Sequence, residues 1–96
     1  MLEKSVESYL RKRVKAAGGK AYKWVCPGCR GVPDRVVCLP GGRVELVELK
    51  TVGGRLSPLQ ELEHERLCRM GCAPWVLWTR EQVDDFMLLV GGGDAK

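Results

Sequence analysis

Apolar side chains recur every three or four residues over residues 3–17, and this spacing predicts an amphipathic helix. The apolar stripe consists of Val6, Leu10, Val14 and Ala17. Most of the Arg and Lys side chains of this segment lie away from the stripe. Gly18 and Gly19 are expected to end the helix, because glycine accepts the left-handed conformation of a helix C-cap.

Alternating apolar and polar residues follow and predict strands. The alternating segments are residues 20–25, 33–39 and 43–50. The turn Pro40-Gly41-Gly42 is short enough to join the last two strands into a hairpin. In a ladder without a bulge, this turn pairs Leu39 with Arg43. Counting back along the same ladder places Asp34 opposite Glu48.

Helical spacing returns in the second half of the chain. Ser57 as N-cap, Pro58 in the first helical position and Gln60 in the third predict a helix start, and Gly71 ends this helix. Its inner side is expected to consist of Leu59, Leu62, Arg66, Leu67 and Met70.

The remaining segments complete one α/β arrangement. Residues 73–78 are almost wholly apolar and predict a buried strand, and Thr79 caps a last helix over residues 80–90. We expect the tail, residues 91–96, to be frayed. The order α-β-β-β-α-β-α predicts a mixed four-stranded central sheet flanked by helices. A chain of 96 residues is expected to form a single domain, residues 1–96.

The net charge of +4 is unevenly distributed. Residues 1–35 contain nine Lys and Arg against three acidic residues, whereas residues 36–96 contain seven against nine. A basic N-terminal part is typical of binding to a phosphate backbone, although a solvated helix face would also explain it.

Two further features bear on the location of the protein. The chain has no apolar run of the roughly 20 residues that a membrane span needs, and its N-terminus lacks the apolar core of a signal peptide. We therefore expect a cytoplasmic protein without a membrane partner. Its five cysteines, an odd number, are expected to be reduced.

Three ionisable residues converge on the open end of the predicted hairpin. Residues i and i+2 of a strand share a face, so Glu48 and Lys50 flank one spot, and Asp34 begins the neighbouring strand. Two carboxylates opposite each other destabilise a sheet unless a cation is present. Carboxylate oxygens suit Mg²⁺ or Mn²⁺, which lowers the pKa of a bound water and neutralises charge on a phosphate. Lys50 would orient that water or stabilise the transition state.

These residues resemble the PD-(D/E)xK nucleases, with Pro33-Asp34 as the first half of the motif and Glu48-Leu49-Lys50 as the second. Together with Gly31–Arg35, Val47–Lys50 and Arg55–Gln60, they look like the virus-type replication-repair nuclease (VRR-NUC) branch of that superfamily. This resemblance implies a restriction-endonuclease-like core.

The resemblance also implies a site and a substrate. The implied metal ligands are Glu7, Asp34 and Glu48, and the implied catalytic residues are Asp34, Glu48, Lys50 and Gln60. The family resembles Holliday-junction resolvases, which implies a structure-specific endonuclease that acts on branched DNA and forms a homodimer. The basic residues expected to contact DNA are Arg11, Lys12, Lys15, Arg30, Arg35 and Arg55.

Several alternatives stay open. Glu7 could instead form an exposed ion pair with Arg11, and a capping box would by itself explain Ser57 and Gln60. The protein could also be a flap or nicking nuclease, or a DNA-binding module of the same fold without catalysis.

A zinc site is a further alternative. Cys26 and Cys29 have zinc-knuckle spacing, and His64, Cys68 and Cys72 recur at every fourth residue of a predicted helix. Three ligands on successive turns are each about 6 Å apart along the helix, so all three cannot readily meet one ion.

Overall fold

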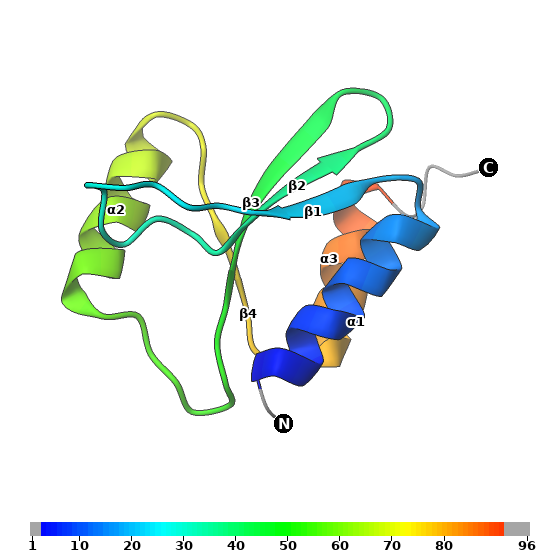
Figure 1. Ribbon diagram of the computed structural model, residues 1–96, viewed down its shortest axis with the longest axis horizontal. Coiled ribbons are helices and arrows are strands. Elements are labelled where there is room, and N and C mark those ends of the chain that lie inside the picture. Colours follow the sequence, from blue (N-terminus) through cyan, green and yellow to red (C-terminus); the bar gives the residue numbers. More distant parts are fainter. Residues whose placement is uncertain (1–2, 92–96) are drawn as a thin grey trace.

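The computed structural model describes residues 3–91, and its elements follow the predicted order (Figure 1). They are α1 (Glu3–Ala16), β1 (Lys20–Lys23), β2 (Arg35–Leu39), β3 (Arg43–Leu49), α2 (Pro58–Arg69), β4 (Trp75–Leu77) and α3 (Arg80–Val90). The predicted α/β fold class and the order α-β-β-β-α-β-α are confirmed. The expectation of a frayed tail falls, from residue 92 onward, outside the described range.

The four strands form one mixed sheet in the order β1-β2-β3-β4. β1, β2 and β3 are antiparallel neighbours, whereas β4 runs parallel to β3. The hairpin pairs Leu39 with Arg43 and Arg35 with Val47, so the predicted register is confirmed. A one-residue slip would turn every side chain of β3 to the other face, and this register therefore decides which residues reach the site.

β2 begins two residues later than predicted, at Arg35. Pro33 has no N–H to donate to a ladder, and the side chain of Asp34 takes the place of a main-chain partner. Its Oδ2 accepts the backbone N–H of Leu49 at 2.8 Å. The Asp34 carboxylate therefore lies beside the end of β3.

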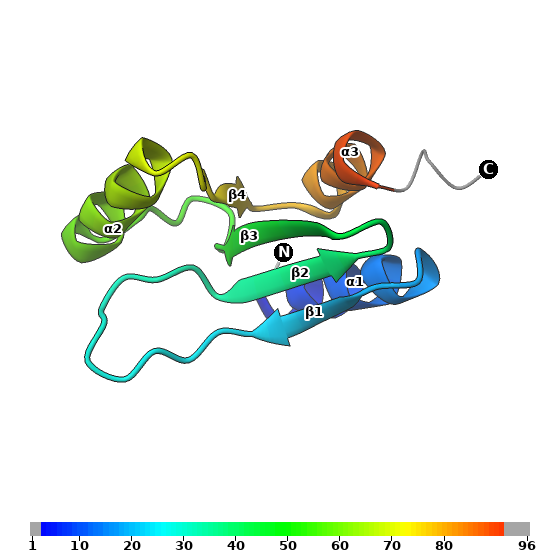
Figure 2. The ribbon, with the colours of Figure 1, turned by 90° about the horizontal axis from the view of Figure 1, so that it is seen from above.

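One face of the sheet carries the hydrophobic core. α1 contacts α3, β1 and β3, and Figure 2 shows α2 at the far end of the molecule from α1 and α3. The core side chains of the helices are Val6, Leu10, Val14, Val83, Phe86, Met87 and Val90, and those of the strands are Ala21, Val37, Leu39, Val47, Leu49 and Leu77. All these strand residues lie on the same face, as alternation requires.

α2 buries a different side from the one predicted, and the prediction of its inner face was wrong. Of the expected inner residues only Leu67 is buried. The others are exposed: Leu59, Leu62, Arg66 and Met70. The inward side chains include Gln60 and His64, which contact the carboxylate of Glu48. An apolar stripe could not make these contacts, so α2 presents polar groups instead.

No helix within residues 3–91 combines the length and the apolar character needed to cross a membrane.

The loop between β1 and β2 is fixed to the start of α2 at Gly31. This glycine has φ +85, and a Cβ placed on it would lie 2.4 Å from the carbonyl oxygen of Leu59. Gly28, in the same loop, has a similar φ of +79 but faces open space. Only a glycine at position 31 therefore lets the two backbones approach so closely.

These two glycines form a matched pair for a stability measurement. Gly28→Ala should lower the free energy of unfolding by about 1–2 kcal/mol, the cost of a left-handed L-residue. Gly31→Ala should lower it by roughly 1–3 kcal/mol more, because the new methyl group overlaps a backbone carbonyl. Urea unfolding followed by tryptophan fluorescence measures both values. Equal losses would show that the contact with Leu59 is unimportant.

Candidate active site

Two carboxylates, those of Asp34 and Glu48, lie where β2 begins and β3 ends. The hydrogen bond from Leu49 N–H to Asp34 Oδ2 joins the two strand ends, and Glu48 is the residue immediately before Leu49. The carbonyl oxygen of Asp34 in turn accepts the N–H of Trp24 at 2.9 Å. Asp34 is therefore held on both sides, by the chain after β1 and by β3.

Glu48 is almost completely buried, with 1% of its surface exposed. Gln60 Nε2 donates a hydrogen bond to Glu48 Oε2 at 3.0 Å, and Lys50 Nζ lies 3.9 Å from the same oxygen. His64 Nε2 lies 3.7 Å from Glu48 Oε1. A charge removed from water is expensive unless it is paired and hydrogen-bonded, and the contacts with Gln60 and Lys50 offset part of that cost.

Gln60 links the start of α2 to this carboxylate. Its side-chain Oε1 accepts the backbone N–H of Ser57 at 2.8 Å, and the backbone N–H of Gln60 donates to Ser57 Oγ at 3.2 Å. The capping box and the contact with Glu48 therefore coexist in one side chain. Glutamine can do both because its amide has an acceptor end and a donor end.

His64 is a site residue that the sequence prediction missed. It is buried, and it follows Gln60 by four residues, so both side chains lie on the same face of α2. This spacing was the available signal, because a residue one turn after a site glutamine faces the same carboxylate.

Glu7 approaches from the other side of the sheet. Its Oε2 pairs with the guanidinium group of Arg35, which also donates to the carbonyl oxygen of Ala21 at 3.2 Å. Glu7 is thus paired with Arg35 rather than with Arg11. Arg35 shares a face with Val47, its partner in the ladder, so Glu48 points to the opposite face.

Glu7 and Asp34 meet at a small hollow of about 260 Å³, which Lys23, Trp24 and Arg35 also line. Two of the three predicted metal ligands thus border one cavity, and the third, Glu48, contacts α2 beside it. Among residues 3–91, no three His, Cys, Asp or Glu side chains stand close enough to form a ready-made ion site.

The donor set nevertheless fits the predicted ions. Mg²⁺ in proteins commonly uses one or two carboxylates and keeps several waters, so a complete protein cage is not required. Asp34 and Glu48 supply hard oxygen donors of this kind from adjacent strand ends. The metal ligand set stays a prediction.

Comparison with known proteins bears on the family. No family model matches the chain. The chain is 49% identical over 69 residues to "Putative nuclease p44" of Acyrthosiphon pisum secondary endosymbiont phage 1, a match that covers 72% of this chain and 74% of that protein. It is also similar to a solved VRR_NUC domain, with a TM-score of 0.83 and 34% identity over 91% of this chain and 95% of that one. The chain belongs to the VRR_NUC family.

The basic residues predicted to contact DNA fall into two groups in this VRR_NUC domain, exposed and buried. Five are exposed, on α1 and in two loops: Arg11, Lys12, Lys15, Arg30 and Arg55. The sixth, Arg35, is only 8% exposed, and its guanidinium group already contacts Glu7 and Ala21. Arg35 is therefore placed to hold Glu7 as well as to line the hollow.

The zinc alternative gains no support in the described part of the VRR_NUC domain. Cys26 and Cys29 lie close together, and a hydrogen bond with the Cys29 thiol raises the pKa of Cys26. Cys68 and Cys72 are exposed, and His64 faces Glu48. No cluster of potential zinc ligands forms within residues 3–91.

The environment of His64 makes a testable prediction. Burial is the main cause that lowers the pKa of His64 below 6.5, and the charge of Lys50 acts in the same direction. Asp34 and Glu63 act in the opposite direction. Glu48, which lies nearest, is also a charged group facing the imidazole.

His64 is the only histidine in the chain, so its imidazole signal can be followed directly by NMR in metal-free buffer. We expect a titration midpoint below 6.5. Because the unfolded chain then binds the proton more readily, the free energy of unfolding should fall as the pH drops below about 6.5. His64→Gln should remove this part of the pH dependence. A midpoint at or above 6.5 would contradict the assignment.

Proposed function

We propose that this VRR_NUC domain is a Mg²⁺- or Mn²⁺-dependent endonuclease that hydrolyses phosphodiesters in branched DNA. One observation carries the proposal. Asp34, Glu48 and Lys50 lie together at the ends of two adjacent strands, and Glu48 is buried there among polar side chains. Such an arrangement has no evident role in packing, but it suits a divalent cation and a phosphate.

The chain's own residues prepare this chemistry. Gln60 fixes the orientation of the Glu48 carboxylate, and Lys50 brings an ammonium group next to it. That ammonium would orient a water molecule or stabilise charge on the phosphate. A bound Mg²⁺ or Mn²⁺ would lower the pKa of a coordinated water and neutralise developing negative charge. Glu7, at the edge of the hollow, is proposed as a third ligand.

The proposed substrate is recognised by shape and backbone. Phosphate contacts position a protein on DNA, whereas base contacts give sequence specificity. The exposed cations of α1 suit the first role. Whether a four-way junction, a flap or a nick is preferred is an outcome of the assay below. The relative from a phage supports action in the cytoplasm of a bacterial or phage-infected cell.

Cleavage of four-way, flap, splayed and nicked DNA in the presence of Mn²⁺ tests this function. We expect cleavage by the wild type, its loss in a chelator, and a decrease of about 100-fold or more in Asp34→Asn and Lys50→Ala. Asp85→Asn is the matched control, because Asp85 is an exposed carboxylate on α3. It should keep full activity.

The same panel separates the alternatives. If the wild type binds these DNAs but cleaves none of them with any divalent ion, the protein is a DNA-binding module without catalysis. If cleavage persists in Asp34→Asn, the assigned site is wrong. Circular dichroism of each variant excludes unfolding as the cause of a loss.

We further propose that the protein acts as a homodimer, since a branched DNA offers two strands to cut. The outward side of α2 supports this. It exposes Leu59 and Leu62, which are neighbours at i and i+3, and Met70, the C-cap residue, about 12 Å farther along the helix axis. Burying such a stripe against a second copy would remove apolar surface from water and would place two sites on one assembly.

Light scattering at micromolar concentration measures the assembly directly. The wild type should have the mass of a dimer, and Leu62→Glu should have that of a monomer, because a charge would be buried in the contact. Leu88→Glu on α3 is the control, since Leu88 is exposed to a similar extent, 68% against 58% for Leu62. A monomeric wild type would refute the proposal, and dissociation by both variants would refute the choice of surface.

A further inference from the structure

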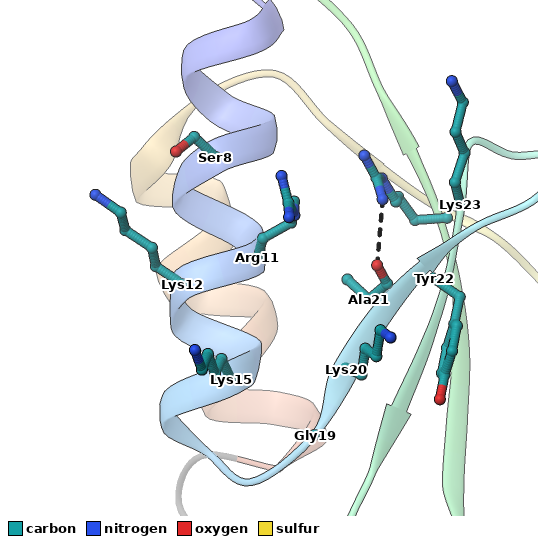
Figure 3. A pocket seen from close by; sticks show the side chains of 10 residues that line it. Ser8, Arg11, Lys12, Lys15, Gly19, Lys20, Ala21, Tyr22 and Lys23 are labelled. Carbon is teal, nitrogen blue, oxygen red and sulfur yellow. Dashed lines mark hydrogen bonds between the residues drawn. The ribbon is translucent and has the colours of Figure 1, made fainter.

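A groove of about 790 Å³ lies between α1 and β1, apart from the residues that surround Glu48 (Figure 3). Six of the ten residues that line it are cationic and none is acidic. Three come from α1, two from β1 and one from β2: Arg11, Lys12, Lys15, Lys20, Lys23 and Arg35. The groove is therefore positively charged along both walls.

The fold explains why these charges gather. The apolar stripe of α1 is turned into the core, which leaves Arg11, Lys12 and Lys15 on its outer side. β1 is an edge strand, so Lys20 and Lys23 stand where no further strand covers them. Helix and strand are consecutive in the chain and pack together, so Lys23, on the face of β1 that α1 covers, shares one space with the helix cations. Lys20 borders the groove from the other face of β1, where its ammonium lies over the ring of Tyr22.

Of the six cations of the groove, only Arg35 pairs with a carboxylate in the described residues, that of Glu7. Elsewhere in residues 3–91, Arg13, Arg43, Arg66 and Arg69 each form an ion pair with a carboxylate. In the same range, no carboxylate lies within ion-pair distance of the five exposed cations of the groove, Arg11, Lys12, Lys15, Lys20 and Lys23. Like charges this close repel one another, and a polyanion in the groove would relieve the repulsion.

The groove is continuous with the candidate active site. Lys23 and Arg35 line both the groove and the hollow that contains Glu7 and Asp34. A strand of DNA that lies in the groove would therefore lead towards the two carboxylates. We propose that the groove binds the sugar–phosphate backbone of the duplex arm adjacent to the cut, an assignment that rests on the proposed nuclease function.

The dimensions limit the length of this contact. From Ser8 to Lys15, the α1 wall of the groove rises about 10 Å at 1.5 Å per residue. This corresponds to about three base-pair steps of a duplex at 3.4 Å each. The groove is thus expected to hold the backbone over roughly three base pairs on one side of the scissile phosphate.

Salt dependence of DNA binding tests the groove without cleavage. It is measured in chelator by fluorescence anisotropy, with a four-way DNA, for two variants of equal charge. Lys12→Gln/Lys15→Gln removes two charges from the groove. Lys4→Gln/Arg69→Gln removes two exposed charges outside it. The first should reduce the slope of log K against log salt by about two, and the second should leave it almost unchanged.

A substrate series in Mn²⁺ then places the groove relative to the cut. For the wild type, kcat/KM should fall when the duplex arm on one side is shortened below about three base pairs. For Lys12→Gln/Lys15→Gln, kcat/KM should be lower than that of the wild type on the long substrate. It should change little as the arm is shortened, because the substitutions and the shortening remove the same contact. Thermal melting of both double variants verifies that they are folded.

The outcomes separate the two proposals. If the wild type cleaves DNA but both double variants lose the same slope, only the net charge matters and the groove proposal is overturned while the nuclease function stands. If Lys12→Gln/Lys15→Gln keeps the wild-type slope, the groove proposal is also overturned. If the wild type cleaves nothing, the nuclease function fails, and the binding measurement still decides whether the groove holds DNA.

Discussion

The buried carboxylate of Glu48 is the constraint on which the arrangement around the site depends. A carboxylate removed from water needs compensation by charges and hydrogen bonds. Strand alternation supplies the charge of Lys50, and α2 supplies the hydrogen bond from Gln60. α2 therefore packs on a charge and not on the apolar core. The hydrophobic core thus lies on one face of the sheet, and the polar contacts of Glu48 lie on the other.

Features that depend on local spacing could be predicted from the sequence. The hairpin register followed from counting across a short turn, and the last helix from a cap and an apolar period. The inner face of α2 could not be predicted in this way, because apolar periodicity assumes an apolar partner. Leu62 and Met70 satisfied the period but point to solvent, and the position of His64 follows only from knowing that Glu48 is the partner.

Contacts between distant segments could not be predicted from local spacing. Local spacing offered Arg11 only as an alternative partner of Glu7, whereas the structure pairs Glu7 with Arg35, which is 28 residues away. The residues expected to contact DNA included Arg11 but not Lys20 or Lys23, which line the same groove only because α1 and β1 pack together. Which residues carry charge is visible in the sequence, but which of them share a space is decided by the packing.

The position of α2 has a consequence for how the molecule can lose its active arrangement. Within residues 3–91, α2 has no extensive contact with any other helix or strand, whereas α1, α3 and the sheet enclose a common core. Regions with few buried apolar contacts open at a lower free energy than the whole molecule. Such a partial opening would withdraw Gln60 and His64 from Glu48 while the core remained folded. The arrangement around Glu48 and the folding of the core are therefore separable properties of this chain.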